Sequence, residues 1–69
     1  MKVTARNCFQ GTIKAVEANG LNAEVIVEIA PGIEIASVIT KTACEKLELE
    51  VGKDAYAIFK ASLVMIGTD

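Results

Sequence analysis

Apolar and polar residues alternate along two stretches in the first half of the chain, Thr12 to Val16 and Leu21 to Ile29. In the second stretch Val25, Val27 and Ile29 share one face, and the opposite face carries mostly amide and carboxylate side chains. Successive side chains of a strand point to opposite sides of a sheet. This period of two therefore predicts two strands, each with one buried face.

Two dipeptides mark the turns between strands. Asn19-Gly20 separates the two alternating stretches and is a strong hairpin signal, because both residues adopt positive φ readily. Pro31-Gly32 is the next break, and the segment IEIASVIT that follows it, residues 33–40, is predicted to be a third strand. The first three strands therefore form an antiparallel meander.

The pattern changes in the segment TKTACEKLEL, residues 40–49. Thr42 and Glu45 have the spacing of a capping box, and Ala43 and Leu47 lie one helical turn apart, so a helix of about two turns is predicted there. The later segment AYAIFKASLVMI, residues 55–66, favours two strands or one strand bent near Ala61-Ser62.

Five strands with a helix between the third and fourth predict an all-β chain with one short helix, a five-stranded OB-like β-barrel. No internal repeat, low-complexity segment or linker divides the sequence, so residues 1–69 are expected to form a single domain.

Composition predicts self-association. Hydrophobic residues make up 52% of a chain of 69 residues, and a chain of this size buries only about 60% of the surface that it exposes when unfolded. Ile26 and Val38 also interrupt the polar faces of their strands. A second subunit would cover this excess apolar surface.

Charge and residue types exclude several classes of function. The net charge of −2 disfavours a nucleic-acid partner, since an OB-fold nucleic-acid binder would want a basic groove with stacking aromatic residues and this chain is acidic with three aromatics. The chain has no histidine, and Cys8 and Cys44 lie far apart, so neither a zinc site, a disulfide nor an enzyme's acid–base pair is indicated. No apolar stretch is long enough to span a membrane and no signal peptide is visible, which predicts a cytoplasmic protein without a membrane partner.

The candidate chemistry lies in islands of hydrogen-bond donors, the segment TARN at residues 4–7, the segment KAS at residues 60–62, and Thr40 with Thr42 before the helix. Each has an ordinary structural explanation: Arg6 as a solvated charge, the threonines as helix caps, and Lys60 as a side chain that reaches solvent from an apolar strand. Together they form a set of donors without a metal-binding carboxylate or histidine, which suits a tetrahedral oxyanion.

Three segments, VTARNCFQGTIKAVEANGLNAEVIVEIAPG, VITKTACEKLEL and GKDAYAIFKASLVMI, resemble the molbindins, the free-standing Mop domains also called transport-associated OB (TOBE) domains. The similarity runs from Lys2 to Ile66 with the motifs in the same order. The resemblance implies a non-catalytic cytoplasmic protein that binds molybdate, and usually tungstate, without any other cofactor. It also implies a homo-oligomer, a hexamer built as a trimer of dimers, with the anion sites between subunits.

The resemblance also implies which residues hold the anion. They are Thr4, Ala5, Arg6, Asn7, Thr40, Ala43, Lys46, Lys60, Ala61 and Ser62. Thr4 stands where the motif commonly has serine, and Ala43 offers only its backbone N–H. Arg6 and Lys60 are expected to reach one anion from different chains. The implied role is storage or buffering of the oxyanion, and the alternatives are a molybdate-sensing regulatory or interaction module and, less favoured, the nucleic-acid binder.

Overall fold

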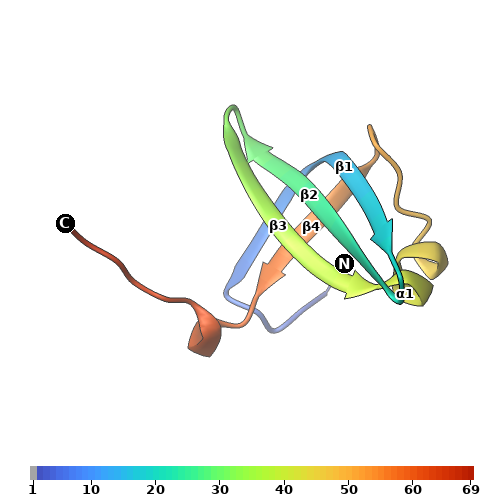
Figure 1. Cartoon of the computed structure of the whole chain (residues 1–69). Helices are drawn as coiled ribbons and strands as arrows, with labels where there is room; N and C mark the ends of the chain where they lie inside the picture. Colours follow the sequence, from blue (N-terminus) through green and yellow to red (C-terminus); the bar gives the residue numbers. More distant parts are fainter. Residues whose placement is uncertain (1) are drawn as a thin grey trace.

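The elements of the chain follow the order strand, strand, strand, helix, strand in a computed structural model that describes residues 2–69 (Figure 1). They are β1 (Asn7–Asn19), β2 (Asn22–Ala30), β3 (Ile33–Thr40), α1 (Lys41–Lys46), β4 (Asp54–Phe59) and the single 3₁₀ turn η1 (Ala61–Leu63). The all-β class with one short helix is thereby confirmed.

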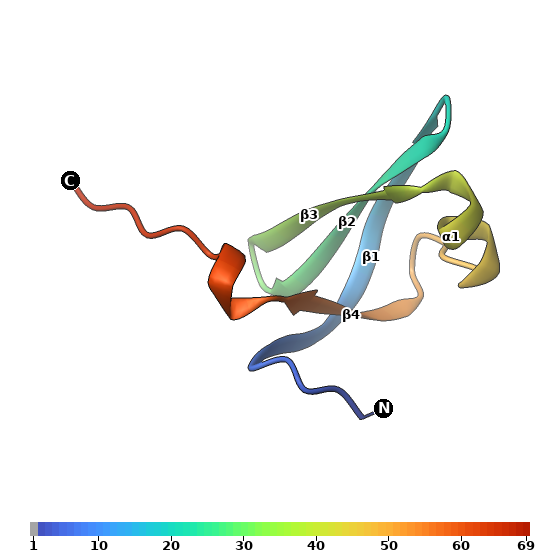
Figure 2. The same ribbon diagram turned by 90° about the horizontal axis from the view of Figure 1, so that it is seen from below.

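The four strands form one antiparallel sheet in the order β3-β2-β1-β4, and the predicted meander of β1, β2 and β3 is confirmed. β1 has two partners along its length: its first half pairs with β4 and its second half with β2, and Thr12 takes part in both ladders. Figures 1 and 2 show the sheet curled around its inner face.

Gly11 allows β1 to bend where it passes from one partner to the other. A Cβ built on Gly11 would overlap the backbone oxygen of Glu28 and lie 2.8 Å from Cγ1 of Val27. The register of β1 against β2 also shifts between Ile13 and Ala15, which marks a β-bulge. The absence of a side chain at Gly11 therefore lets β1 approach β2 closely enough to curve the sheet.

Both predicted turns are present, but the first has a different register. Asn19 pairs with Asn22, so the two residues of the loop are Gly20 and Leu21, and Gly20 has φ +66°. Positive φ is thus needed only at the glycine, not at Asn19. The second hairpin turns at Pro31-Gly32, where Gly32 has φ +77°.

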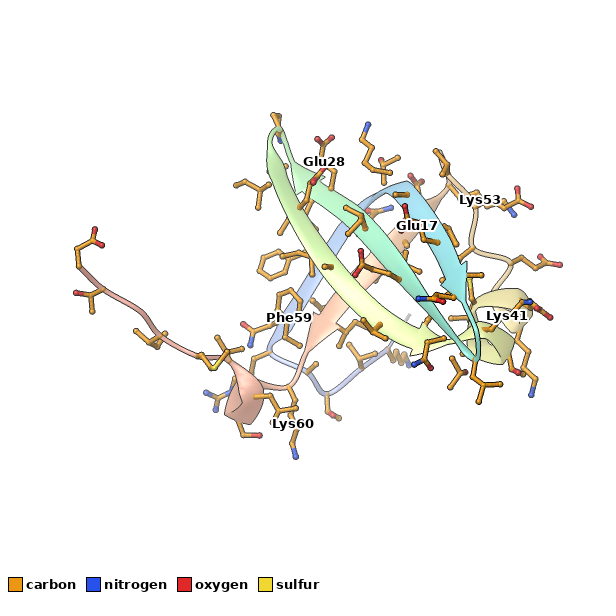
Figure 3. The ribbon with its side chains drawn as sticks, viewed as in Figure 1. Glu17, Glu28, Lys41, Lys53, Phe59 and Lys60 are labelled. Carbon is orange, nitrogen blue, oxygen red and sulfur yellow. The ribbon has the colours of Figure 1, made fainter. Side chains whose placement is uncertain are left out.

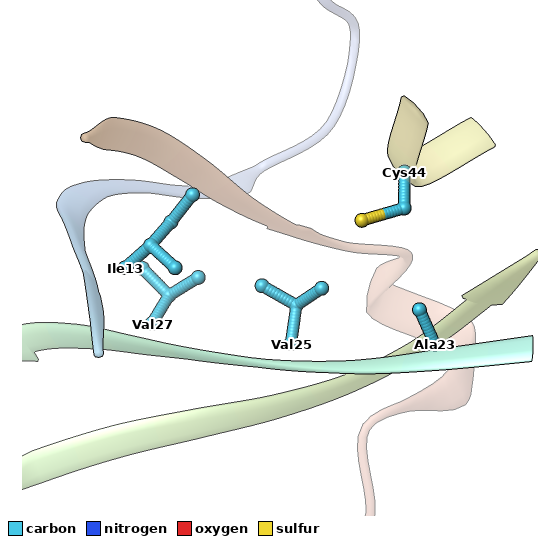
Figure 4. Packing of buried hydrophobic residues seen from close by; sticks show 5 residues of the cluster. All are labelled: Ile13, Ala23, Val25, Val27 and Cys44. Carbon is cyan, nitrogen blue, oxygen red and sulfur yellow. The ribbon is translucent and has the colours of Figure 1, made fainter. Parts of the chain in front are cut away.

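The buried core lies between the inner face of the sheet and α1 (Figure 4). Its members are Ile13, Ala23, Val25, Val27 and Cys44. The prediction that Val25 and Val27 share the buried face of β2 is confirmed, and Ile29 packs against the same cluster. Cys44 is the buried residue of α1, so the helix covers one end of the curled sheet.

The helix begins two residues earlier than the capping box predicted. The N-cap is Thr40, whose side-chain oxygen accepts a hydrogen bond of 3.0 Å from the backbone N–H of Ala43, whereas Thr42 lies inside the helix. The capping-box assignment to Thr42 is therefore wrong. Because β3 ends at Thr40, the cap and the strand end coincide, which a spacing rule within the helix does not detect.

The fifth strand and the closed barrel are not formed in residues 2–69. After β4 the chain makes the turn η1, and residues 64–69 then extend away from the sheet in both views (Figures 1 and 2). Met65 is 93% exposed and Ile66 is 88% exposed. A strand needs a ladder partner for its backbone, and residues 2–69 offer none to the tail.

Candidate functional site

Two of the predicted donor segments meet at one end of the β1–β4 ladder. Asn7, the first residue of β1, pairs with Phe59, the last residue of β4. Arg6 precedes Asn7 and Lys60 follows Phe59, so both residues lie directly beyond the last pair of the ladder, at the same end. We call the surface formed by Thr4, Ala5, Arg6, Asn7, Lys60, Ala61 and Ser62 the cationic end.

Lys60 is not a buried lysine within a strand. It is exposed, and it is the N-cap residue of η1, where its carbonyl accepts a hydrogen bond of 2.9 Å from the N–H of Leu63 (Figure 3). Strand β4 ends at Phe59, so the ammonium group reaches solvent without crossing the core. The sequence-based expectation of a lysine in the middle of an apolar strand is therefore wrong.

The cationic end carries two positive charges, and an aromatic pair lies on the adjoining strands β1 and β4. The rings of Phe9 and Phe59 lie 6.0 Å apart between centroids at an interplanar angle of 44°, and Phe9 is 45% exposed. Lys14 and Glu28 form the one ion pair within residues 2–69, and neither Arg6 nor Lys60 is paired with a carboxylate in this part of the chain. Two cations without a carboxylate partner suit a small anion better than a cation.

The other predicted donors lie at the helix. Thr40 is its N-cap, Ala43 is half-buried in its first turn, and Lys46 is exposed in its last turn. The N–H of Ala43 is already bonded to the Thr40 oxygen, so Ala43 has no free donor while that cap is intact. Thr40 retains its hydroxyl proton as a donor.

The helix and the cationic end are at opposite ends of the molecule. Thr40 pairs with Asn22, which pairs with Asn19 at the end of β1, whereas Asn7 starts that 13-residue strand. Figure 3 shows Lys41 beside α1 and Lys60 beyond the end of β4, at different ends of the molecule, and Figure 2 separates α1 from the turn after β4 in the same way. A strand rises about 3.3 Å per residue, so the 13-residue β1 is far longer than a small anion. One anion therefore does not contact both the helix residues and the cationic end of the same chain.

The predicted site is thus brought together only in part. The register places Arg6 and Lys60 at the same end of the β1–β4 ladder in one chain, and the expectation that they reach one anion from different chains stays a prediction. The helix residues lie at the other end of the chain. Sequence reasoning did not include Phe9 and Phe59, because a cross-strand aromatic pair is visible only once the ladder register is known.

Residues 2–69 do not support a metal site, an anion site beside Cys44 or a membrane-spanning helix. Within residues 2–69 no group of three or more histidine, cysteine, aspartate or glutamate side chains is placed to hold a metal ion. The hollow beside Cys44 is lined by Glu45, Glu48, Glu50 and Lys53, so three carboxylates face one ammonium group and the net charge disfavours an anion. No helix in residues 2–69 has the length and apolar character needed to cross a bilayer.

A family model described as the TOBE domain matches residues 4–66, nearly the whole chain. The chain belongs to the TOBE domain family. A "Probable molybdenum-pterin-binding protein" of Haemophilus influenzae is 42% identical to this TOBE chain over 69 residues, which cover 100% of both proteins. The resemblance to the Mop domains is thereby confirmed.

Solved structures show the same fold. "MopII from Clostridium pasteurianum" is 33% identical, with a TM-score of 0.92 over 97% of this TOBE chain and 100% of that chain. ModG, described as a "cytoplasmic molybdate-binding protein" and solved with molybdate bound, is 41% identical, with a TM-score of 0.83 over 88% of this chain and 43% of its own. The open four-stranded sheet of this chain therefore has the OB-like topology of these Mop proteins.

Proposed function

We propose that this TOBE domain binds molybdate, and also tungstate, as an intact oxyanion and stores or buffers it in the cytoplasm without catalysing a reaction. The observation that carries the proposal is the cationic end, where Arg6 and Lys60 flank one rung of the β1–β4 ladder without a carboxylate partner in residues 2–69. Arginine and lysine beside hydroxyl and amide donors suit a tetrahedral dianion, which offers acceptors only. The relatives named for molybdenum-pterin binding and for molybdate binding support the same ligand.

The proposed site lies between chains. Its first part is the cationic end of one chain, with Arg6, Asn7, Lys60 and Ser62 as donors and the backbone of Ala5 and Ala61 beside them. Its second part is the helix end of another chain, with the Thr40 hydroxyl as donor and Ala43 and Lys46 close to it. Since these two parts lie at opposite ends of one chain, a site that uses both requires two chains.

The exposed apolar surface supports the oligomer that such a site requires. Val38, Met65 and Ile66 are each at least 66% exposed, and the tail that carries Met65 and Ile66 pairs with no strand of the described residues 2–69. We propose that residues 1–69 form one domain that assembles as a hexamer, a trimer of dimers. This part of the proposal rests on the family resemblance and on the uncovered apolar residues.

Isothermal titration of the anion-free protein with molybdate, tungstate, sulfate and phosphate tests the ligand. All four are tetrahedral oxyanions, so a site with fixed donors must distinguish them mainly by size. The smaller sulfate leaves donors unpaired at about 1–3 kcal/mol each, so molybdate and tungstate should bind much more tightly. Equal affinities for molybdate and sulfate would contradict a dedicated molybdate site.

A sensing role is the second candidate function, because the same domain could report the anion to a partner protein instead of storing it. The two roles differ in stoichiometry and in partners. Storage requires high occupancy by the anion without any other protein, whereas sensing requires a protein that binds only one of the two ligand states. Pull-down with the protein with and without molybdate distinguishes them.

A further inference from the structure

The turn between β1 and β2 carries the dipeptide Asn19-Gly20, which the candidate functional site does not use. Asn19 and Gly20 are both exposed, and a Cβ built on Gly20 meets no atom within 4 Å. The backbone φ is +66° at Gly20 and negative at Leu21, as in a type II′ turn with glycine at the first central position. The side-chain amide of Asn19 and the backbone N–H of Gly20 therefore both face water at the tip of the hairpin.

Within residues 2–69 no hydrogen bond holds either of these two groups. The Gly20 N–H donates to no backbone carbonyl, and the Asn19 amide takes part in no side-chain hydrogen bond of this part of the chain. Asn19 pairs with Asn22 in the last pair of the β1–β2 ladder, and the end of a ladder opens more readily than its middle. Opening of this single pair lets the backbone of Asn19 rotate, while the buried core begins only at the next pair, with Ala23.

The two exposed groups are chemically able to react with each other. The Gly20 nitrogen, after it loses its proton to hydroxide, attacks the side-chain carbonyl carbon of Asn19. The amide nitrogen takes up a proton from water and leaves as ammonia, so that a cyclic succinimide forms, and water then opens the ring to aspartate or isoaspartate at position 19. Glycine favours the attack because it has no Cβ to obstruct a close approach to its nitrogen. We propose that Asn19-Gly20 is a site of spontaneous deamidation in the folded protein.

The other asparagines of the chain, Asn7 and Asn22, lack these features. Asn22 is followed by Ala23, which is 1% exposed, and it pairs with Asn19 on one side and with Thr40 on the other. Asn7 also lies in a strand and is not followed by glycine. The modification should therefore be confined to Asn19.

The two products of the reaction differ in their effect on the fold. Aspartate keeps the length of the backbone and adds a negative charge, whereas isoaspartate routes the backbone through the side-chain carbonyl and so lengthens a very short loop. In this loop the carbonyl of Leu21 accepts a hydrogen bond of 2.8 Å from the N–H of Lys41, the first residue of α1. Isoaspartate should displace that carbonyl and loosen the start of the helix, and aspartate should not.

Peptide mapping by mass spectrometry measures the conversion of each asparagine while the native protein is incubated in mildly alkaline buffer. Asn19 should lose its amide roughly tenfold faster than Asn22 or more, because only Asn19 precedes a glycine in an exposed turn. Asn19→Gln is the matched variant, since it keeps the amide but would have to form a larger ring, and it should stay unmodified. The same incubation in urea gives the rate in the unfolded chain. An Asn19 amide that the native protein retains while the unfolded chain loses it, or equal rates at Asn19 and Asn22, would overturn the inference.

Amide hydrogen exchange at Lys41 tests the effect on the helix. In the isoaspartate form, purified by chromatography, the Lys41 N–H should exchange at least tenfold faster than in the unmodified protein, because its acceptor on Leu21 is displaced. Asn19→Asp supplies the aspartate form and should exchange at nearly the unmodified rate. An unchanged rate in the isoaspartate form would overturn the link between the hairpin tip and α1. Both measurements are made without molybdate, so their outcome is independent of the proposed function.

Discussion

Asn7 and Phe59 are cross-strand partners at the end of the β1–β4 ladder, so that one chain presents Arg6 and Lys60 together. These positions are more than fifty residues apart in the sequence, yet the register brings them to one surface.

Arg6→Ala and Lys60→Ala are each expected to weaken molybdate binding by roughly 2–5 kcal/mol, about 30-fold or more, because each leaves the dianion with too few cationic partners. Isothermal titration measures the effect. Lys14→Ala removes the same charge from a distant ion pair and should leave the affinity nearly unchanged. Normal affinity in either of the first two variants would exclude that residue from the site.

Mixed assemblies show which donors come from one chain. When Arg6→Ala and Lys60→Ala chains are refolded together, tight sites should not return, because every cationic end lacks one cation. When Lys60→Ala chains are mixed with Thr40→Val chains, some sites should combine an intact cationic end with an intact helix end, so a fraction of tight binding should return. Native mass spectrometry confirms the mixing, and recovery in the first mixture would show that Arg6 and Lys60 serve one anion from different chains.

Thr40 is expected to stabilise the helix, whereas Thr42 is not. Thr40→Ala removes the oxygen that accepts the N–H of Ala43 at 3.0 Å and should lower the free energy of unfolding by about 1 kcal/mol. Thr40→Ser should retain most of the stability. Thr42→Ala is the control and should change stability little. The measurement is urea unfolding of the anion-free protein, and a larger loss for Thr42→Ala would restore the capping box suggested by the sequence.

Gly11→Ala is expected to destabilise the fold by about 1–3 kcal/mol, because the added methyl group overlaps the Glu28 backbone and Cγ1 of Val27. Gly67→Ala is the matched control, since a Cβ there meets no atom within 4 Å. Thermal unfolding of both variants compares them. A Gly11→Ala protein as stable as Gly67→Ala would show that β1 does not need its close approach to β2.

The apolar tail is expected to contribute to assembly. Met65→Asp combined with Ile66→Asp places charge on two residues that are 93% and 88% exposed in the single chain, so the chain itself should still fold. If another subunit buries these side chains, the variant should sediment as smaller species than the wild type, because buried unpaired charges oppose association. Thr68→Asp controls for added charge, and an unchanged oligomer in the double variant would exclude the tail from the interface.

The sequence by itself determined much of this protein. The alternation along Val25, Val27 and Ile29 identified the buried face of β2, and segment 33–40 matches β3. These features depend on local periodicity and on turn residues, which are encoded within a few positions. The family resemblance, which the comparisons confirm, identified the donor segments in the same way, as motifs of adjacent residues.

Only the tertiary structure decided how distant segments meet. Strand pairing across the sheet placed Arg6 and Lys60 at one end and Thr40 at the other, and no local pattern carries that register. The end of β4 at Phe59 decided that Lys60 is exposed, because a strand continues only where a neighbouring backbone offers hydrogen bonds. For the same reason, the apolar segment after η1 could be recognised as strand-like from its residues, but it forms no strand because the described part of the chain, residues 2–69, provides no partner for it.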